Sequence, residues 1–163
     1  YRVRARNGAG RSEPSNVVGP VTVKMDTLVD ELVDFSRVNS RSGNWKIASD
    51  DCRATKEDAF RADGVAGSTL VYQLPTGVAG FRVFAFFPKA ESGLKFSVSA
   101  DGEKYHAVVA QKESYFHGAG DYGYWMPVEY HAENLHGGSF LKIELTGETQ
   151  ISRIEIIHPA PSP

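Results

Sequence analysis

The densest group of side chains that could do chemistry lies in one glycine-rich segment, residues 112–125, which reads KESYFHGAGDYGYW. Its glycines disfavour a regular strand and its aromatic rings disfavour plain solvation, so we expect a loop whose rings either cap the core or face a ligand. Such rings pack against the flat C–H faces of sugars, while neighbouring polar groups hydrogen-bond the hydroxyls. The side chains considered for ligand contact are Lys112, Tyr115, Phe116, His117, Tyr122, Tyr124 and Trp125.

Two tryptophans have a packing alternative. For Trp125 core packing is favoured, because it stands directly before the predicted strand PVEYHAE. Trp45 follows the polar stretch RSGN and is a second candidate ring, with packing over the edge of the sheets as its alternative.

Several cations carry donors that suit sugar hydroxyls or the carboxylate of an acidic sugar. Ordinary solvent exposure is the competing interpretation for each of them. They are Arg41, Arg53, Lys56, Arg61 and Lys112.

Two acidic pairs offer oxygen ligands of the kind that Ca²⁺ prefers. Asp50 and Asp51 open the segment DDCRATKED, which also contains Glu57 and Asp58. The rival pair is Asp30 and Glu31, at a first strand expected soon after residue 28. Neither spacing matches a standard calcium loop. One structural calcium ion is therefore an expectation from ligand type, with either pair as its location.

Motifs of enzymatic catalysis are not found in the sequence. There is no G-x-S-x-G, no H-E-x-x-H and no phosphate-binding glycine loop. A glycosidase needs two carboxylates about 5–10 Å apart across a cleft, yet nothing in the sequence marks such a pair. The lone Cys52 has no neighbouring histidine and is interpreted as a small buried residue. We expect a non-catalytic domain, with a small catalytic domain as an alternative class.

The elements that must position these side chains are short strands. β-Branched and aromatic residues recur in segments bounded by Gly, Pro, Asp or Asn. In FLKIELT, for example, Leu141, Ile143 and Leu145 share one face while Lys142 and Glu144 share the other. Such strands at regular spacing predict an all-β, antiparallel sandwich. The predicted strands are STLVYQL, GFRVFAFF, LKFSVSA, KYHAVVAQ, PVEYHAE, FLKIELT and ISRIEIIH.

The order of these cues resembles the β-sandwich carbohydrate-binding modules, jelly-roll or discoidin-like, of bacterial glycoside hydrolases and polysaccharide lyases. The resemblance covers residues 28–158 and includes an S-x-D-G turn at Ser99, Asp101 and Gly102. It implies polysaccharide binding, through the end loops or a concave sheet face, and modules of this type often carry one calcium ion. A structural spacer or protein-adhesion sandwich without sugar binding is the alternative.

The first residues resemble a piece of another domain. YRVRARNGAGRSEPSNVV has the alternation of a strand, followed by a hairpin turn at NGAG. It is similar to the closing hairpin of a fibronectin type III domain. The resemblance implies a secreted, extracellular bacterial parent with covalently linked catalytic and fibronectin type III domains. The expected division is 1–19 for this remnant, 20–27 for a linker, 28–158 for the sandwich and 159–163 for the start of a proline-rich linker.

Composition narrows the classes of partner. The chain has 163 residues and a formal net charge of -2, so it can bury one ordinary core and offers no electrostatic attraction to nucleic acid. No apolar run is long enough to cross a bilayer. We expect a monomer whose partner is a polysaccharide, without a nucleic-acid or membrane partner.

Overall fold

The computed structural model of the protein describes residues 24–55, 59–88, 92–114, 125, 127–136 and 138–161, together with two short strands near the start of the chain. Those strands, β1 (Arg6–Asn7) and β2 (Gly10–Arg11), pair antiparallel. The sequence predicts a hairpin there. Its assignment to a fibronectin type III domain stays a prediction, as do the domain boundaries.

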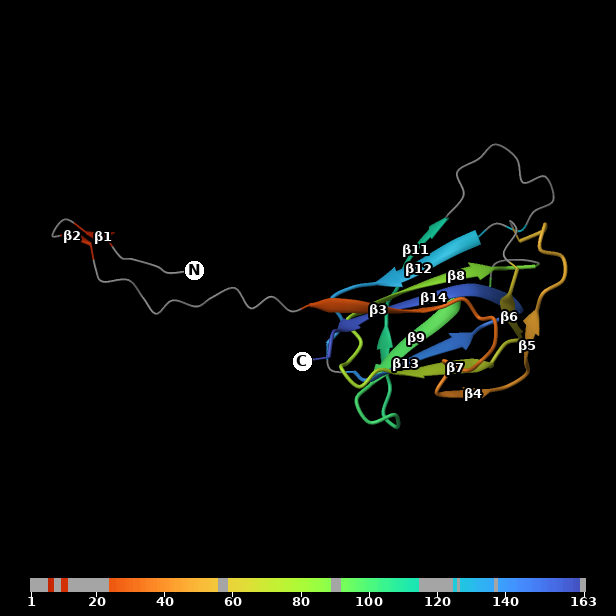
Figure 1. The fold of residues 1–163 in the computed structure, drawn as a ribbon, viewed down its shortest axis with the longest axis horizontal. Coiled ribbons are helices and arrows are strands. Elements are labelled where there is room, and N and C mark those ends of the chain that lie inside the picture. Colours follow the sequence, from red (N-terminus) through yellow and green to blue (C-terminus); the bar gives the residue numbers. More distant parts are fainter. Residues whose placement is uncertain are drawn as a thin grey trace.

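Two antiparallel sheets form the main body of the described chain (Figure 1). The first sheet has the strand order β10 (His106–Val108), β9 (Leu94–Ser99), β13 (Phe140–Leu145), β7 (Thr69–Gln73) and β4 (Ser40–Ser42). The second has the order β11 (Gln111–Ser114), β12 (Pro127–Ala132), β8 (Gly80–Phe86), β14 (Thr149–Pro159), β6 (Arg61–Gly64) and β5 (Trp45–Ala48). Its seventh strand, β3 (Met25–Asp30), pairs with the C-terminal part of β14.

Secondary structure outside the sheets is limited to turns and irregular loops in the residues that the structure describes, and no helix occurs among them. None of these residues therefore belongs to a helix long and apolar enough to cross a membrane. All strand pairings are antiparallel, which confirms the predicted all-β antiparallel sandwich.

The core lies between the two sheets, and alternation along the strands builds it. The inward residues of β8, β13 and β14 are fully buried: Phe81, Val83, Ala85, Leu141, Ile143, Leu145, Ile154 and Ile156. Phe81 of one sheet stacks on Phe96 of the other, with 4.6 Å between ring centroids. Tyr130 extends this cluster, at 5.7 Å from the Phe96 ring and 6.5 Å from Phe87. The aromatic cluster joins the sheets through packing and burial.

Strand β8 is central, as its nearly continuous apolar sequence predicts. It pairs with β12 on one side and with β14 on the other. Phe86, which alternates with core-facing Ala85, is nevertheless only 1% exposed. The outer face of the sheet is therefore covered at the Phe86 end of the strand.

The S-x-D-G turn after β9 is built around one carboxylate. Asp101 Oδ1 accepts hydrogen bonds from the backbone N–H groups of Glu103 at 2.8 Å and Lys104 at 2.9 Å. The Ser99 hydroxyl donates to the same oxygen at 2.9 Å. These donors, led by the Lys104 and Glu103 amides, lower the pKa of Asp101 to about 2.

Acid is expected to weaken this turn in a defined pH window. The pKa of Asp101 is about 2 in the folded protein against 3.8 ordinarily, so the stabilisation is present above pH 4 and is lost as pH falls towards 2. We expect Asp101→Asn to have a lower Tm than the wild type at pH 6, with the difference shrinking towards pH 2. Glu103→Gln is the matched control, because only its backbone contributes to the turn. A wild-type–variant difference that stays constant from pH 6 to pH 2 would contradict the expectation.

Candidate functional site

The predicted aromatic loop is described only at its two ends. Lys112 lies in β11 and is exposed, so the chain is still a strand where the loop was expected to begin. Trp125 is half-buried at the other end. The roles of the intervening candidates stay predictions, because these residues lie outside the described part of the chain: Tyr115, Phe116, His117, Tyr122 and Tyr124.

Trp125 connects this segment to a second loop. Its backbone N–H donates to the carbonyl oxygen of Ala54 at 2.8 Å. Ala54 lies in residues 49–55, the turn that also contains Asp50, Asp51 and Arg53. The structure therefore brings together two segments that are far apart in the sequence and that both carry predicted site residues. We call this region the loop end of the sandwich, defined by residues 49–55 and Trp125.

The turn at residues 49–55 is closed by its own hydrogen bonds. The amide of Ala54 donates to the Asp51 carbonyl at 3.0 Å, and the amide of Thr55 donates to the Cys52 carbonyl at 3.1 Å. The Thr55 hydroxyl donates to the same Cys52 carbonyl, also at 3.1 Å, and Thr55 is fully buried. Asp51 has a φ of 51°, in the left-handed region that Asp tolerates better than most residues. The turn is therefore a defined structure whose inward side chain is Thr55.

The outward side of the turn is polar. Arg53 is exposed, and no hydrogen bond or ion pair of its side chain occurs with the other described residues. The side chain of Asp50 is 92% exposed. These two side chains can donate to and accept from a ligand's hydroxyls without first breaking a buried contact.

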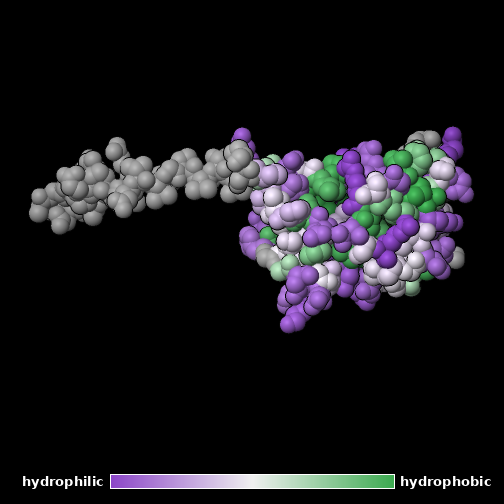
Figure 2. Space-filling model, turned by 60° about the horizontal axis from the view of Figure 1, so that its bottom comes forward, coloured by the Kyte–Doolittle hydropathy of each residue, from purple (hydrophilic) through white to green (hydrophobic). Residues whose placement is uncertain are grey.

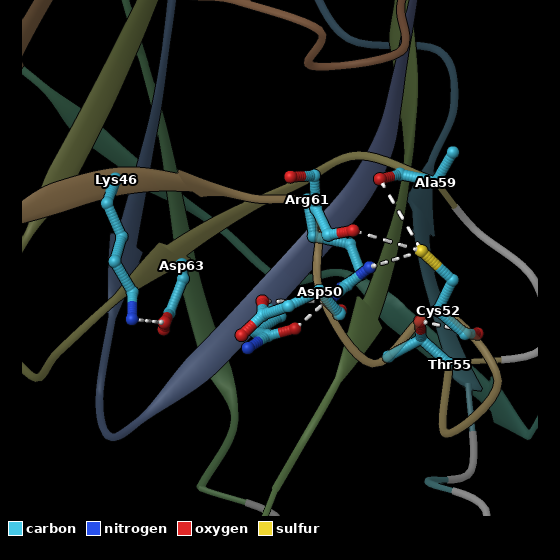
Figure 3. A network of polar contacts seen from close by, with 9 residues as sticks. Lys46, Asp50, Cys52, Thr55, Ala59, Arg61 and Asp63 are labelled. Carbon is cyan, nitrogen blue, oxygen red and sulfur yellow. Dashed lines mark hydrogen bonds and ion pairs between the residues drawn. The ribbon is translucent and has the colours of Figure 1, made fainter.

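Arg61 does not lie at the surface, where the sequence analysis considered it as a ligand-binding cation. Its side chain is 1% exposed, and it lies beneath the turn rather than on it (Figure 3). The Nε group donates to Gln150 Oε1 at 2.7 Å, and an Nη2 group donates to the main-chain carbonyl of Asp50. Direct sugar contact by Arg61 is therefore wrong, because the guanidinium is enclosed by protein acceptors. Arg41, the other arginine considered, is exposed and lies 4.1 Å over the Phe35 ring.

Cys52 is less buried than predicted. It is a free thiol of intermediate exposure, whose Sγ donates to the Ser49 carbonyl at 3.3 Å. Its surroundings in the turn are polar backbone groups rather than an apolar core. The thiol therefore lies at the loop end, next to the candidate ligand-binding residues.

One aromatic side chain near this region escaped the sequence analysis. Phe60, which directly precedes β6, is 39% exposed. An aromatic residue just after the polar segment DDCRATKED is the signal that would have drawn attention to it. Phe60 adds an exposed ring to the segment that leads from the turn into the sheet.

Trp45 takes the packing position that was its alternative. Its indole N–H donates to the carbonyls of Ser42 at 3.0 Å and Thr69 at 3.1 Å, which belong to the opposite sheet. Its ring lies against Gly64, where an added Cβ would come within 2.9 Å of ring carbons. Phe35 meets the indole edge-on, with 6.4 Å between centroids. Trp45 closes the edge of the sandwich, and a contact of its ring with a ligand stays a prediction.

The four predicted calcium ligands lie in different environments. Asp30 is 4% exposed, and its carboxylate accepts from the Tyr72 hydroxyl at 2.9 Å and the Leu32 amide at 2.9 Å. Glu31 pairs with Arg153 at 2.9 Å. Across the described residues, no three His, Cys, Asp or Glu side chains are grouped in a way that could hold a metal ion. Asp50 and Asp51 lie on the exposed turn. Their carboxylate oxygens are therefore more available to a metal ion than those of Asp30 and Glu31.

Calcium binding stays a prediction with a direct test. A chelator is expected to lower the Tm by a few degrees without abolishing cooperative unfolding, and calcium is expected to restore it, because an ion bound only to the folded state stabilises that state. Asp50→Asn should reduce the response to calcium. Glu31→Gln tests the rival pair, and Glu103→Gln, at an exposed acid outside both pairs, is the control. An unchanged Tm in protein shown by elemental analysis to be metal-free would remove the prediction.

An apolar groove of the described structure lies away from these residues. It has a volume of about 800 Å³, and its apolar walls include Met25, Val78, Leu135 and Ile157. It lies near Gly80, the start of β8, whereas the loop end lies beyond Phe86, the end of the same strand. None of the predicted site residues belongs to its described walls. The groove and the predicted site residues therefore lie at opposite ends of the sandwich.

A concave sheet face is the other location that the resemblance leaves open, and the outer face of the five-stranded sheet is one sheet face that can be described. Lys142 Nζ lies 4.0 Å from the centre of the Tyr105 ring, and Asn39 donates to Gln73 Oε1 at 3.0 Å. Figure 2 brings forward the lower side of Figure 1 and shows apolar patches separated by polar residues. This face therefore has an aromatic ring and polar groups that could bind a sugar, but these side chains contact one another.

In comparisons with known proteins, the chain is similar in structure to several solved proteins. No family model matches the chain, and no curated protein matches it. A family 6 carbohydrate-binding module is 13% identical, with a TM-score of 0.48 over 82% of this chain and 94% of that chain. The catalytic domain of a GH87 α-1,3-glucanase in complex with nigerose is 14% identical, with a TM-score of 0.48 over 86% of this chain. This chain spans 30% of the length of that glucanase chain. A family GH115 4-O-methyl-α-glucuronidase is 12% identical with a TM-score of 0.38, over 76% of this chain and 18% of that chain.

Proposed function

We propose that residues 28–158 are a non-catalytic carbohydrate-binding module that binds a polysaccharide at the loop end of the sandwich. The observation that carries this proposal is the hydrogen bond of 2.8 Å between the Trp125 amide and the Ala54 carbonyl. It joins the segment richest in aromatic residues to a turn that exposes Arg53 and Asp50. Rings beside exposed donors and acceptors form the combination that a sugar requires.

The wider setting is part of the same proposal. The module would hold a secreted bacterial glycoside hydrolase or polysaccharide lyase at its polysaccharide, as one unit of a longer polypeptide. The resemblance of residues 1–18 to the end of a fibronectin type III domain supports this setting. The fold supports ligand binding by loops, since an antiparallel sandwich provides rigid strands that present loops at each end.

A spacer or protein-adhesion role is a second candidate, and one observation favours it. The apolar groove of about 800 Å³ lies where β3 begins and β14 ends, and Met25 on its wall is 48% exposed. The residue pair Met25 and Pro159 places the entering and leaving chain side by side at this groove. A neighbouring protein surface could cover such an apolar area.

Affinity electrophoresis against a panel of soluble polysaccharides tests the proposed function. The module should be retarded in gels that contain at least one polysaccharide and should migrate normally in gels without it. The panel should include neutral and uronic-acid-containing polymers, because Arg53 suits either hydroxyls or a carboxylate. Normal migration in every gel, by protein with a cooperative thermal transition, would favour the spacer or adhesion role instead.

A further inference from the structure

Arg61 is buried beneath the loop end and contacts two separate parts of the chain. It lies in β6, and its side chain is 1% exposed, which is rare for arginine. Its Nε donates to Gln150 of β14 at 2.7 Å, which anchors the guanidinium to the sheet. On its other side, Nη2 donates to the Asp50 carbonyl, and Nη1 lies 3.9 Å from Cys52 Sγ (Figure 3). One planar group therefore connects the sheet to the turn at residues 49–55.

The contacts of Arg61 act through hydrogen bonds more than through an ion pair. The carboxylate of Asp50 is 3.9 Å from Nη2 and its side chain is 92% exposed, so this pair is screened by water. The acceptors at closer range are a side-chain amide and a main-chain carbonyl, which lie in different directions. A planar guanidinium can reach both at once, whereas a lysine ammonium lacks this fork.

The turn held in this way also holds the backbone of Trp125. Its Ala54 carbonyl accepts the Trp125 amide at 2.8 Å, and its exposed side carries Arg53. Displacement of the turn would therefore move Asp50, Arg53 and Trp125, which belong to the proposed binding site.

We propose that Arg61 is the positioning residue of this site: it fixes the turn at residues 49–55 from beneath, and through Ala54 it fixes Trp125. Arg61 does not touch the ligand. The effect on affinity rests on the proposed function, whereas the effect on the turn does not.

The lone thiol of Cys52 reports the state of the turn without any ligand. Its Sγ contacts Ser49, Ala59 and Arg61, so loosening of the turn should expose it. We expect Arg61→Lys to accelerate alkylation of Cys52 by iodoacetamide about tenfold, because a buried donor set is lost. Amide hydrogen exchange should accelerate at Thr55 and Trp125 but stay unchanged in the core strand at Ile154.

Two further variants keep the test decisive. Gln150→Leu removes the acceptor that anchors Arg61 to the sheet and leaves the turn sequence intact, so it serves if Arg61→Lys fails to fold. Lys46→Ala is the matched control. Lys46 is a cation on the neighbouring strand β5 whose partner, Asp63 at 3.0 Å, is on β6, but its side chain is 74% exposed. Alkylation, exchange and affinity should all be unchanged in that control.

Binding to the polysaccharide that retards the wild type supplies the second readout. We expect the affinity of the Arg61 and Gln150 variants to fall about tenfold, together with faster alkylation. A lower Tm with unchanged alkylation and exchange at the turn would overturn the proposal, and so would a loosened turn with unchanged affinity. If no polysaccharide binds the wild type, the proposed function fails, while alkylation and exchange still decide whether Arg61 fixes the turn.

Discussion

Replacing Phe81 by Ala is expected to lower the free energy of unfolding by about 3–5 kcal/mol, the usual cost of emptying a buried aromatic site. Phe81 is fully buried on β8, and its ring stacks on Phe96 of the opposite sheet at 4.6 Å between centroids. The substitution removes apolar burial and a ring contact that joins the sheets, and neighbouring strands can only partly fill the space. Because domains are stable by about 5–15 kcal/mol, a large share of the fold's stability is at risk.

Urea denaturation of Phe81→Ala and the wild type provides the measurement. Val109→Ala is the matched control, since Val109 is 94% exposed and its truncation should change the stability by less than about 0.5 kcal/mol. A loss below about 1 kcal/mol for Phe81→Ala would show that this ring stack does not hold the two sheets together.

Replacing a single tyrosine of the aromatic segment by Ala is expected to weaken polysaccharide binding about ten- to hundredfold. A stacking ring contributes roughly 1–3 kcal/mol, by analogy with bases stacked on aromatic residues and with the anchors of protein interfaces. The variants are Tyr115→Ala, Tyr122→Ala and Tyr124→Ala, compared with the wild type by affinity electrophoresis. Their thermal stability should stay close to that of the wild type.

Two further substitutions separate binding from folding. Tyr130→Ala is the strand control: Tyr130 is 6% exposed and contacts Phe96 and Phe87, so its loss should lower the Tm. Trp45 is the second candidate ring, but its indole bonds two carbonyls, so Trp45→Phe tests its ring with less damage to packing. If every folded loop variant binds as the wild type does, the concave sheet face becomes the leading location.

The sequence predicts the strands that have a clear apolar alternation and misses those that are short and polar. In β13 and β14 the alternating Leu and Ile residues specify which face is buried. Strand β4 is Ser-Arg-Ser and all three residues are exposed, so its pairing with β7 defines it as a strand. Strand β6 contains Arg61 and Asp63, and its burial depends on partners such as Gln150 that lie elsewhere in the sequence.

The sequence predicted which types of residue form the candidate site better than it predicted how they are arranged in space. Aromatic density marks residues 112–125, and Arg53 is found exposed as a ligand-binding cation must be. The contact between Trp125 and Ala54 depends on how the sheets place two distant loops, which local sequence patterns do not encode. Arg61 has the same residue type as Arg53, and only its buried acceptors distinguish a supporting role from a surface one.

The most direct test of polysaccharide binding at the loop end is to map amide chemical shifts in ¹⁵N-labelled protein. The titrant is an oligosaccharide from the polysaccharide that retards the module in gels. We predict saturable shifts at Arg53, Ala54 and Trp125, with the amides of Ser97 and Lys142 on the five-stranded sheet unchanged. Shifts confined to that sheet, with residues 49–55 and Trp125 unaffected at saturation, would contradict binding at the loop end.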